Sequence, residues 1–99
     1  MKLVVNRCYG GFELSKEAVE YLGFKWDGHG YLFKLGMNRD DPRLVKCVEE
    51  LGTDVASGKC AKLVVVEIPD GINYGVEEYD GVETVVNEDY RDLYYVKEL

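Results

Sequence analysis

The feature of this sequence that most restricts its fold is the apolar run at residues 63–68, which is closed by Pro69, Asp70 and Gly71. A short run rich in β-branched residues and bounded by turn residues is typical of a buried strand. We therefore expect a central strand here, on which the rest of the chain packs. Residues 72–79 are again β-branched and aromatic, so the sequence predicts that they pair antiparallel with this strand, with Pro69 at the strand end.

The length and composition limit the architecture. The chain has 99 residues, of which 46% are apolar, and this suffices for one hydrophobic core. We predict a single domain, residues 1–99, of the α+β class, with a mainly antiparallel sheet and two short helices. No segment approaches the roughly 20 apolar residues that cross a bilayer, and residues 1–5 hold too few for a signal peptide. A cytoplasmic protein without membrane contact is therefore expected.

The two predicted helices have recognisable ends. Ser15 is a preferred N-cap residue and precedes a helical segment at residues 16–22. Asp41 is a second N-cap, and Pro42 follows it at the first helical position, where its missing N–H costs nothing. Gly52 marks the C-terminus of this second helix. Between Gly52 and the central strand we expect a loop.

Two further segments have strand character. Residues 24–26 and 31–35 alternate in polarity around a glycine-rich loop, which predicts a hairpin. Residues 93–96 are aromatic and β-branched, and we expect them to add an edge strand.

The dipeptide Asp80-Gly81 resembles a type I′ turn between two strands. A two-residue turn at this place would set Glu78 opposite Glu83, which is an unfavourable like-charge pair on a sheet. The sequence therefore favours a strand that runs straight through, with a bulge at Gly81, and leaves the tight hairpin as the alternative.

The residues that could carry catalysis give no local signature. His29, the single histidine, lies between two glycines, and nothing in the sequence brings a cysteine or serine to it. The three cysteines are an odd number without C-x-x-C spacing, which argues against a disulfide framework and a zinc site. We expect reduced thiols, with Cys47 in the core. The sequence predicts a non-enzymatic protein with no metal and no cofactor.

The charge balance points to a protein partner. The chain carries 19 acidic and 12 basic side chains, a net charge of −7, which argues against direct binding of DNA or an anionic membrane. The same charge suits the basic surface of another protein. Tyrosines crowd the acidic C-terminal third, and tyrosine is favoured at interfaces, although it is also a common strand residue. The candidate partner-binding residues are Tyr74, Glu77, Glu78, Tyr79 and Asp80.

A second candidate site is the glycine loop before the first helix. Backbone N–H groups at Gly10 and Gly11, with the helix N-terminus at Ser15, favour an anion, and Arg7 could add a positive charge. Neither the P-loop nor the dinucleotide-binding glycine pattern is present. An ordinary structural turn therefore remains the alternative at this loop.

Four segments together resemble a family of small phage and prophage proteins. They read Asn-Arg-Cys-Tyr-Gly-Gly-Phe-Glu-Leu-Ser at residues 6–15, Arg-Asp-Asp-Pro-Arg-Leu-Val at 39–45 with Val-Glu-Glu-Leu-Gly at 48–52, Val-Glu-Ile-Pro-Asp at 66–70 and Glu-Glu-Tyr-Asp-Gly at 77–81. The resemblance covers most of the chain, from Val5 to about Glu88. The closing residues 90–96 depart from the shorter basic, aromatic ending of that family.

The resemblance implies an accessory protein that acts in the host cytoplasm. The expected role is inhibition of a host defence protein, in which the acidic, tyrosine-rich residues compete for a basic site on a nuclease or effector. The alternative is a sponge, an oligomer that sequesters a cyclic nucleotide signal. In that alternative the phosphate-binding residues are Arg7, Gly10, Gly11, Ser15 and Arg39.

Overall fold

The computed structural model describes residues 1–95 and 97–99, and these residues form an α+β fold, as the sequence predicts. The strands belong to two antiparallel sheets, one of two strands and one of three. In chain order the elements are β1 (Lys2–Asn6), α1 (Lys16–Tyr21), α2 (Leu32–Leu35), α3 (Pro42–Leu51), α4 (Thr53–Ala56), β2 (Leu63–Glu67), β3 (Tyr74–Tyr79), β4 (Val82–Asn87) and β5 (Tyr90–Tyr95).

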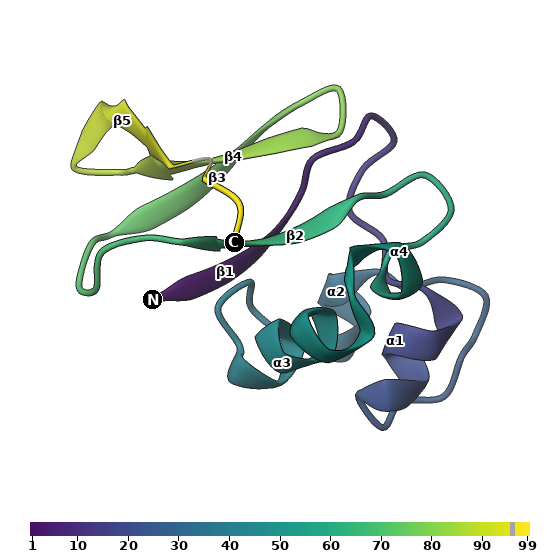
Figure 1. The fold of residues 1–99 in the computed structure, drawn as a ribbon. Coiled ribbons are helices and arrows are strands. Elements are labelled where there is room, and N and C mark those ends of the chain that lie inside the picture. The colour runs from purple at the N-terminus through teal and green to yellow at the C-terminus, as the bar shows by residue number, and fades with distance from the viewer. Residues whose placement is uncertain (96) are drawn as a thin grey trace.

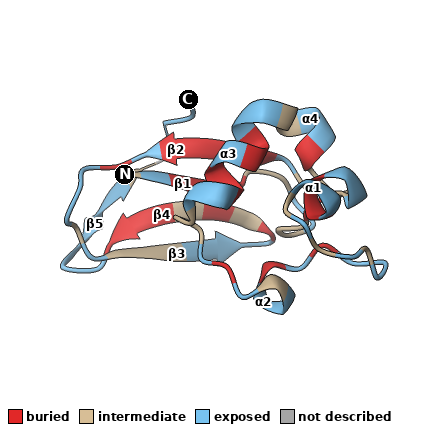
Figure 2. Cartoon of the chain, turned by 90° about the horizontal axis from the view of Figure 1, so that it is seen from below, coloured by how far each residue is buried: buried red, intermediate tan, exposed pale blue. Residues whose placement is uncertain are grey.

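A two-stranded ribbon of β1 and β2 forms the middle layer of the molecule. The helices α1, α3 and α4 pack on one of its faces, and the sheet β3-β4-β5 lies on the other (Figure 1). The pairing is antiparallel, with Leu3 opposite Val66 and Val5 opposite Val64. The predicted central strand is therefore confirmed as buried, as the red colouring of β2 in Figure 2 shows.

Alternation along the ribbon explains why residues 3–5 of β1 and 63–66 of β2 are apolar at successive positions. Val4 and Val65 face the helices, and Leu3 and Val66 face the three-stranded sheet. Because successive strand residues point to opposite faces, a strand segment that is covered on both sides is apolar at consecutive positions. The apolar run at residues 63–68 is thus the signature of a middle layer.

The predicted pairing of residues 63–68 with 72–79 is wrong. β2 pairs with β1, and β3 pairs with β4. The physical reason is that the partner of β2 must also be apolar on both faces. β1 meets this requirement, whereas β3 ends in exposed Glu77, Glu78 and Tyr79.

Both predicted helices are confirmed. The Ser15 hydroxyl accepts the Ala18 N–H at 3.1 Å before α1, and the Asp41 carboxylate accepts the Arg43 N–H at 2.9 Å before α3. α3 ends at Gly52, whose φ of 83° suits glycine. The expected loop after Gly52 instead begins with the short helix α4.

The predicted hairpin at residues 24–35 is wrong. Residues 24–31 have no regular structure, and the helix α2 follows them. The Leu14 N–H donates to the Gly30 carbonyl at 2.9 Å, and a Cβ at position 30 would clash with the Leu14 backbone. Trp26 is partly buried and packs against the core on the helical side of the ribbon. The apolar side chains of this segment thus pack against the helical core and do not form a paired strand.

The tight turn at Asp80-Gly81 is present, so the favoured alternative of a strand running straight through is wrong. Asp80 has φ 54° and Gly81 has φ 94°, and Glu78 does lie opposite Glu83. The like charges are tolerated because Glu83 is buried against Arg39, whereas Glu78 is exposed.

The predicted edge strand at the end of the chain is confirmed as β5, which pairs with β4 across a register shift between Val86 and Asn87. Val96, the last residue of that prediction, lies outside the described residues. Among residues 1–95 and 97–99, no helix has the length and hydrophobicity to cross a membrane.

Candidate functional site

A buried ion pair joins the two halves of the molecule. The Glu83 side chain is only 4% exposed, and its carboxylate accepts hydrogen bonds from Arg39 Nη1 and Nη2, at 2.5 and 2.6 Å. It also accepts the Asn6 N–H at 2.7 Å. The Arg39 guanidinium lies 4.1 Å from the centre of the Phe12 ring, a cation–π distance. With its donors directed at a buried carboxylate, Arg39 acts as a structural residue.

A second group of hydrogen bonds ties the loop after β1 to the β3–β4 hairpin. Arg7 Nη1 donates to the Glu83 carbonyl at 2.7 Å. The Asn6 side chain donates to the carbonyls of Cys8 and Gly81, each at 2.7 Å, and accepts the Lys62 N–H at 2.8 Å. Sequence reasoning missed Asn6 and Glu83. The available signal was one of polarity, because each is a polar residue beside the apolar residues of its strand.

The structure does not gather the nucleotide-site candidates into one open cradle. The Ser15 hydroxyl donates to the Val55 carbonyl at 2.6 Å, away from the glycine loop. A Cβ at Gly81 would lie 2.5 Å from the backbone nitrogens of both Gly10 and Gly11, so the hairpin turn covers this loop. Arg7 and Arg39 both donate hydrogen bonds to Glu83, Arg7 to its backbone carbonyl and Arg39 to its carboxylate, and not to an open anion site. The nucleotide site stays a prediction that this geometry does not favour.

The five partner-binding candidates lie along β3 and its turn, but they do not share one face. Tyr74 and Glu78 point to the inner side of the sheet, as does Val85, and Glu77 and Tyr79 point to the outer side. Tyr74 is half-buried, and burial together with the charge of Asp40 raises the pKa of its hydroxyl. The sequence-predicted site is therefore a strand edge and a hairpin tip.

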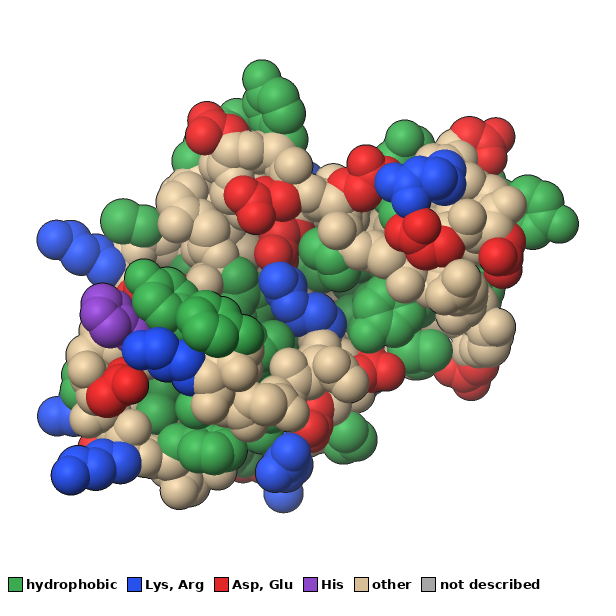
Figure 3. Space-filling model, turned by 180° about the vertical axis from the view of Figure 1, so that it is seen from behind, with side chains coloured by type: hydrophobic (Ala, Val, Ile, Leu, Met, Phe, Trp, Pro, Cys, Tyr) green, Lys and Arg blue, Asp and Glu red, His purple; other side chains and the backbone are tan. Residues whose placement is uncertain are grey.

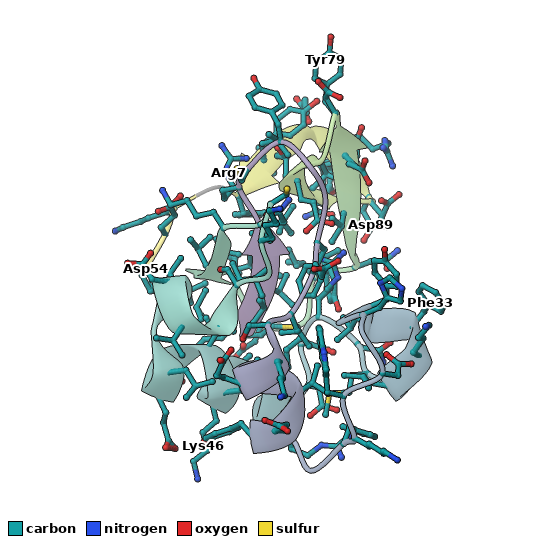
Figure 4. All side chains as sticks on the ribbon, turned by 90° about the vertical axis from the view of Figure 1, so that its right-hand side faces the viewer. Arg7, Phe33, Lys46, Asp54, Tyr79 and Asp89 are labelled. Carbon is teal, nitrogen blue, oxygen red and sulfur yellow. The ribbon has the colours of Figure 1, made fainter. Side chains whose placement is uncertain are left out.

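On the outer side, Glu77 is already part of an ion network. Arg91 donates to Glu77 at 2.7 Å and to Glu88 at 2.5 Å. Tyr79 is 83% exposed, and Figure 4 shows it at the tip of the hairpin, pointing away from the rest of the molecule. Tyr79 and Asp80, at the tip of the hairpin, are thus both exposed.

On the inner side, a groove of about 430 Å³ separates the hairpin from α2. Tyr31 and Phe33 form an aromatic wall of this groove, and His29 stacks on Tyr31 beside it. The rings are nearly parallel, with centres 5.1 Å (His29–Tyr31) and 5.8 Å (Tyr31–Phe33) apart. Phe33 is 79% exposed and projects from α2 in Figure 4. The groove is lined by Phe12, Tyr31, Leu32, Phe33, Met37, Arg39, Glu78 and Glu83.

The charges of the chain are divided between its two halves. Residues 1–62 carry ten basic and nine acidic side chains, whereas residues 63–99 carry ten acidic and two basic ones. Figure 3 shows the result on one face, where red side chains crowd the sheet at the upper right and blue ones surround the helices at the lower left. The negative potential of the molecule is therefore concentrated on the three-stranded sheet.

The cysteines have separate environments. Cys47 is buried in α3, as the sequence predicts, and burial raises the pKa of its thiol to about 11. Cys60 is exposed and Cys8 is half-buried. In the part of the chain that the structure describes, no three histidine, cysteine or acidic side chains form a group that could hold a metal ion.

Comparison with protein-family models, with curated proteins and with solved structures gives no match for this chain.

Proposed function

We propose that this chain is a non-enzymatic binding protein that recognises a basic surface of another protein through its β3-β4-β5 sheet. The observation that carries the proposal is the coincidence of negative charge and exposed tyrosine on this sheet. Residues 74–95 hold seven acidic side chains and one basic one. Tyr79, Tyr90 and Tyr94 are 83%, 65% and 59% exposed. Tyrosine is enriched in protein interfaces, and charged groups on a surface guide the association of proteins of opposite charge.

The biological setting that we propose is inhibition of a host defence protein, which the resemblance to small phage proteins implies. A nuclease or effector that handles nucleic acid has a basic surface, and an acidic protein that covers this surface would compete with the nucleic acid. Such inhibition requires binding only, and no bond of the partner is made or broken.

A matched pair of charge reversals tests this proposal. Glu77→Lys with Glu78→Lys changes the charge of β3, and Glu17→Lys with Glu20→Lys makes the same change at exposed positions of α1. Each variant, like the wild type, is immobilised and exposed to extract of the cells in which the gene resides. Captured proteins are quantified by mass spectrometry at low and high ionic strength, after circular dichroism has shown that both variants are folded.

We expect the wild type and the α1 variant to capture the same basic proteins, and the β3 variant to capture far less of them. High salt should release these proteins, because it screens the attraction between opposite charges. A purified partner should lose its own activity when the wild-type chain is added. Equal capture by the two charge-reversed variants would contradict the proposal, because it would show that net charge and not the sheet governs binding.

A further inference from the structure

The type I′ turn fixes which backbone groups of β3 are free. In a two-residue hairpin, the residues that flank the turn exchange both hydrogen bonds, and the next pair exchanges none. Tyr79 and Val82 therefore form a bonded pair, and Glu78 and Glu83 do not. By the same alternation, the N–H and C=O groups of Tyr74, Val76 and Glu78 point away from β4.

The opposite side of the hairpin confirms this alternation. The Glu83 carbonyl, which points away from β3, accepts the Arg7 guanidinium at 2.7 Å. Val85, two residues later, pairs with Tyr95 of β5. Within the described residues, β3 pairs with β4 alone, and Figure 2 shows it in tan and pale blue at the border of the sheet. β3 thus presents a regular row of free donors and acceptors.

The other strand edges are covered or irregular. On β1, the Val4 N–H donates to the Arg39 carbonyl at 3.0 Å. On β2, the Leu99 N–H donates to the Val65 carbonyl at 2.8 Å, so the C-terminal residues occupy that edge. β5 also borders its sheet, but the bulge in its pairing with β4 interrupts a continuous template. The free edge of β3 is therefore the best place for an added strand.

The surroundings of this edge select the chemistry of such a strand. A residue that lies opposite Glu78 shares its face of the sheet, and so it would point into the groove between the hairpin and α2. There it would meet the Glu78 carboxylate and the exposed ring of Phe33. The Arg39 charge in the same groove is already balanced by Glu83. An arginine or lysine suits this place, because its stem can pack on the ring while its cation pairs with Glu78.

We propose that an extended basic segment of the partner protein adds to the free edge of β3 as a fourth strand, with an arginine or lysine opposite Glu78. This inference rests on the proposed function and names its mode of binding. Hydrogen bonds to Val76 and Glu78 supply sequence-independent affinity, and the groove supplies selectivity for the basic side chain. A second copy of this chain is disfavoured on this edge, because it would bring together two net charges of −7.

The test separates the backbone donor of Val76 from its side chain. Val76→Pro removes the N–H that points away from β4, so it costs no hydrogen bond within the hairpin. Val76→Ala is the matched control, because it shortens the side chain and keeps the donor. Short random peptides displayed on phage are selected on the wild-type chain, and the enriched peptides are synthesised and measured on both variants by calorimetry.

We expect enriched peptides in which basic residues alternate with apolar ones. Their affinity for Val76→Ala should stay within about threefold of wild type, and their affinity for Val76→Pro should fall by about tenfold or more. Should Val76→Pro fail to fold, the same peptides bound to the wild type should protect the amides of Val76 and Glu78 from hydrogen exchange.

The outcomes distinguish this inference from the proposed function. Basic peptides that bind Val76→Pro as well as Val76→Ala, or that leave these amides unprotected, would overturn edge pairing and support the acidic sheet as a surface. Peptides that need the donor but lack basic residues would overturn the basic partner. A selection without enriched peptides would count against both. If the wild type is a dimer and Val76→Pro is a monomer, the edge binds a second copy of the chain, and the inference is overturned.

Discussion

The helix-covered face of the ribbon and the three-stranded sheet differ in burial and in charge. The helices α1, α3 and α4 close over Val4, Leu63 and Val65, which are almost fully buried. On the sheet, the residues of β5 are mostly exposed, as is the second half of β3. Residues 1–62 are nearly neutral, whereas the sheet lies in the acidic part of the chain. The ribbon and helices hold most of the buried core, and in our proposal the exposed, acidic sheet carries the surface for recognition.

The largest expected effect lies at the junction of the two regions. Arg39→Ala leaves the buried Glu83 carboxylate without its main partner, and we expect the free energy of unfolding to fall by about 3 to 5 kcal/mol in urea denaturation. Arg43→Ala is the control, because Arg43 also pairs with an aspartate but is well exposed, and it should cost less than about 1 kcal/mol. Equal losses would show that the two regions are not joined through Glu83.

The second test compares the same truncation in each region. Leu44 is fully buried in α3, and Leu44→Ala should lower the free energy of unfolding by about 3 kcal/mol. Leu93 of β5 is partly exposed, and Leu93→Ala should lower it by less than about 1 kcal/mol. A loss at Leu93 as large as that at Leu44 would contradict the division of roles.

A smaller effect is expected at the N-terminus of α3. Asp41→Ala removes the cap of the Arg43 N–H and should cost about 1 kcal/mol, whereas Asp41→Asn keeps an acceptor and should cost much less. Arg43 lowers the pKa of the Asp41 carboxyl. A lowered pKa in the folded state means that the contribution of the carboxylate is present above the unfolded value, about 3.9, and is lost as the pH falls through the folded one. The difference in Tm between wild type and Asp41→Ala, measured by thermal unfolding, should therefore become smaller as the pH falls below about 3.9.

The reactivity of the thiols tests the burial of the helical region without a mutation. Iodoacetamide should modify exposed Cys60 quickly, and Cys47 only at the rate at which the helical region opens. Burial raises the pKa of Cys47 from 9 to about 11, so its contribution to stability is complete below pH 9 and is lost as the pH rises through 11. Mass spectrometry of the modified chain checks both rates. Equal rates for the two thiols would show that the α3 core is open.

Local signals in the sequence predicted local structure. The caps at Ser15 and Asp41, the end of α3 at Gly52 and the strand character of β5 depend on neighbouring residues, and all are confirmed. The partner of the central strand was missed, because β1 lies about 60 residues earlier in the chain and no local pattern names it. Strand pairing is decided by which segment can fill both adjacent layers.

The sequence names the residues of the candidate site but does not show their geometry. The acidic, tyrosine-rich residues do lie on β3 and its turn, yet alternation places Glu77 and Glu78 on opposite faces. The ion pair of Arg39 with Glu83 joins residues 44 positions apart, and neither residue has a local signal for the other. From the sequence, Arg39 is a candidate phosphate ligand in the alternative nucleotide site. The sequence alone does not show that the guanidinium faces a buried carboxylate.

The most direct test of the free β3 edge is amide hydrogen exchange of the free protein at low concentration, monitored by NMR. Amides of the ribbon, such as those of Val4 and Val65, should exchange only through global unfolding. Along β3 we expect an alternating pattern, in which Glu77 and Tyr79 are protected by β4 and Val76 and Glu78 exchange rapidly. Slow exchange at Val76 and Glu78 would contradict the central claim, because it would show that the edge is already occupied.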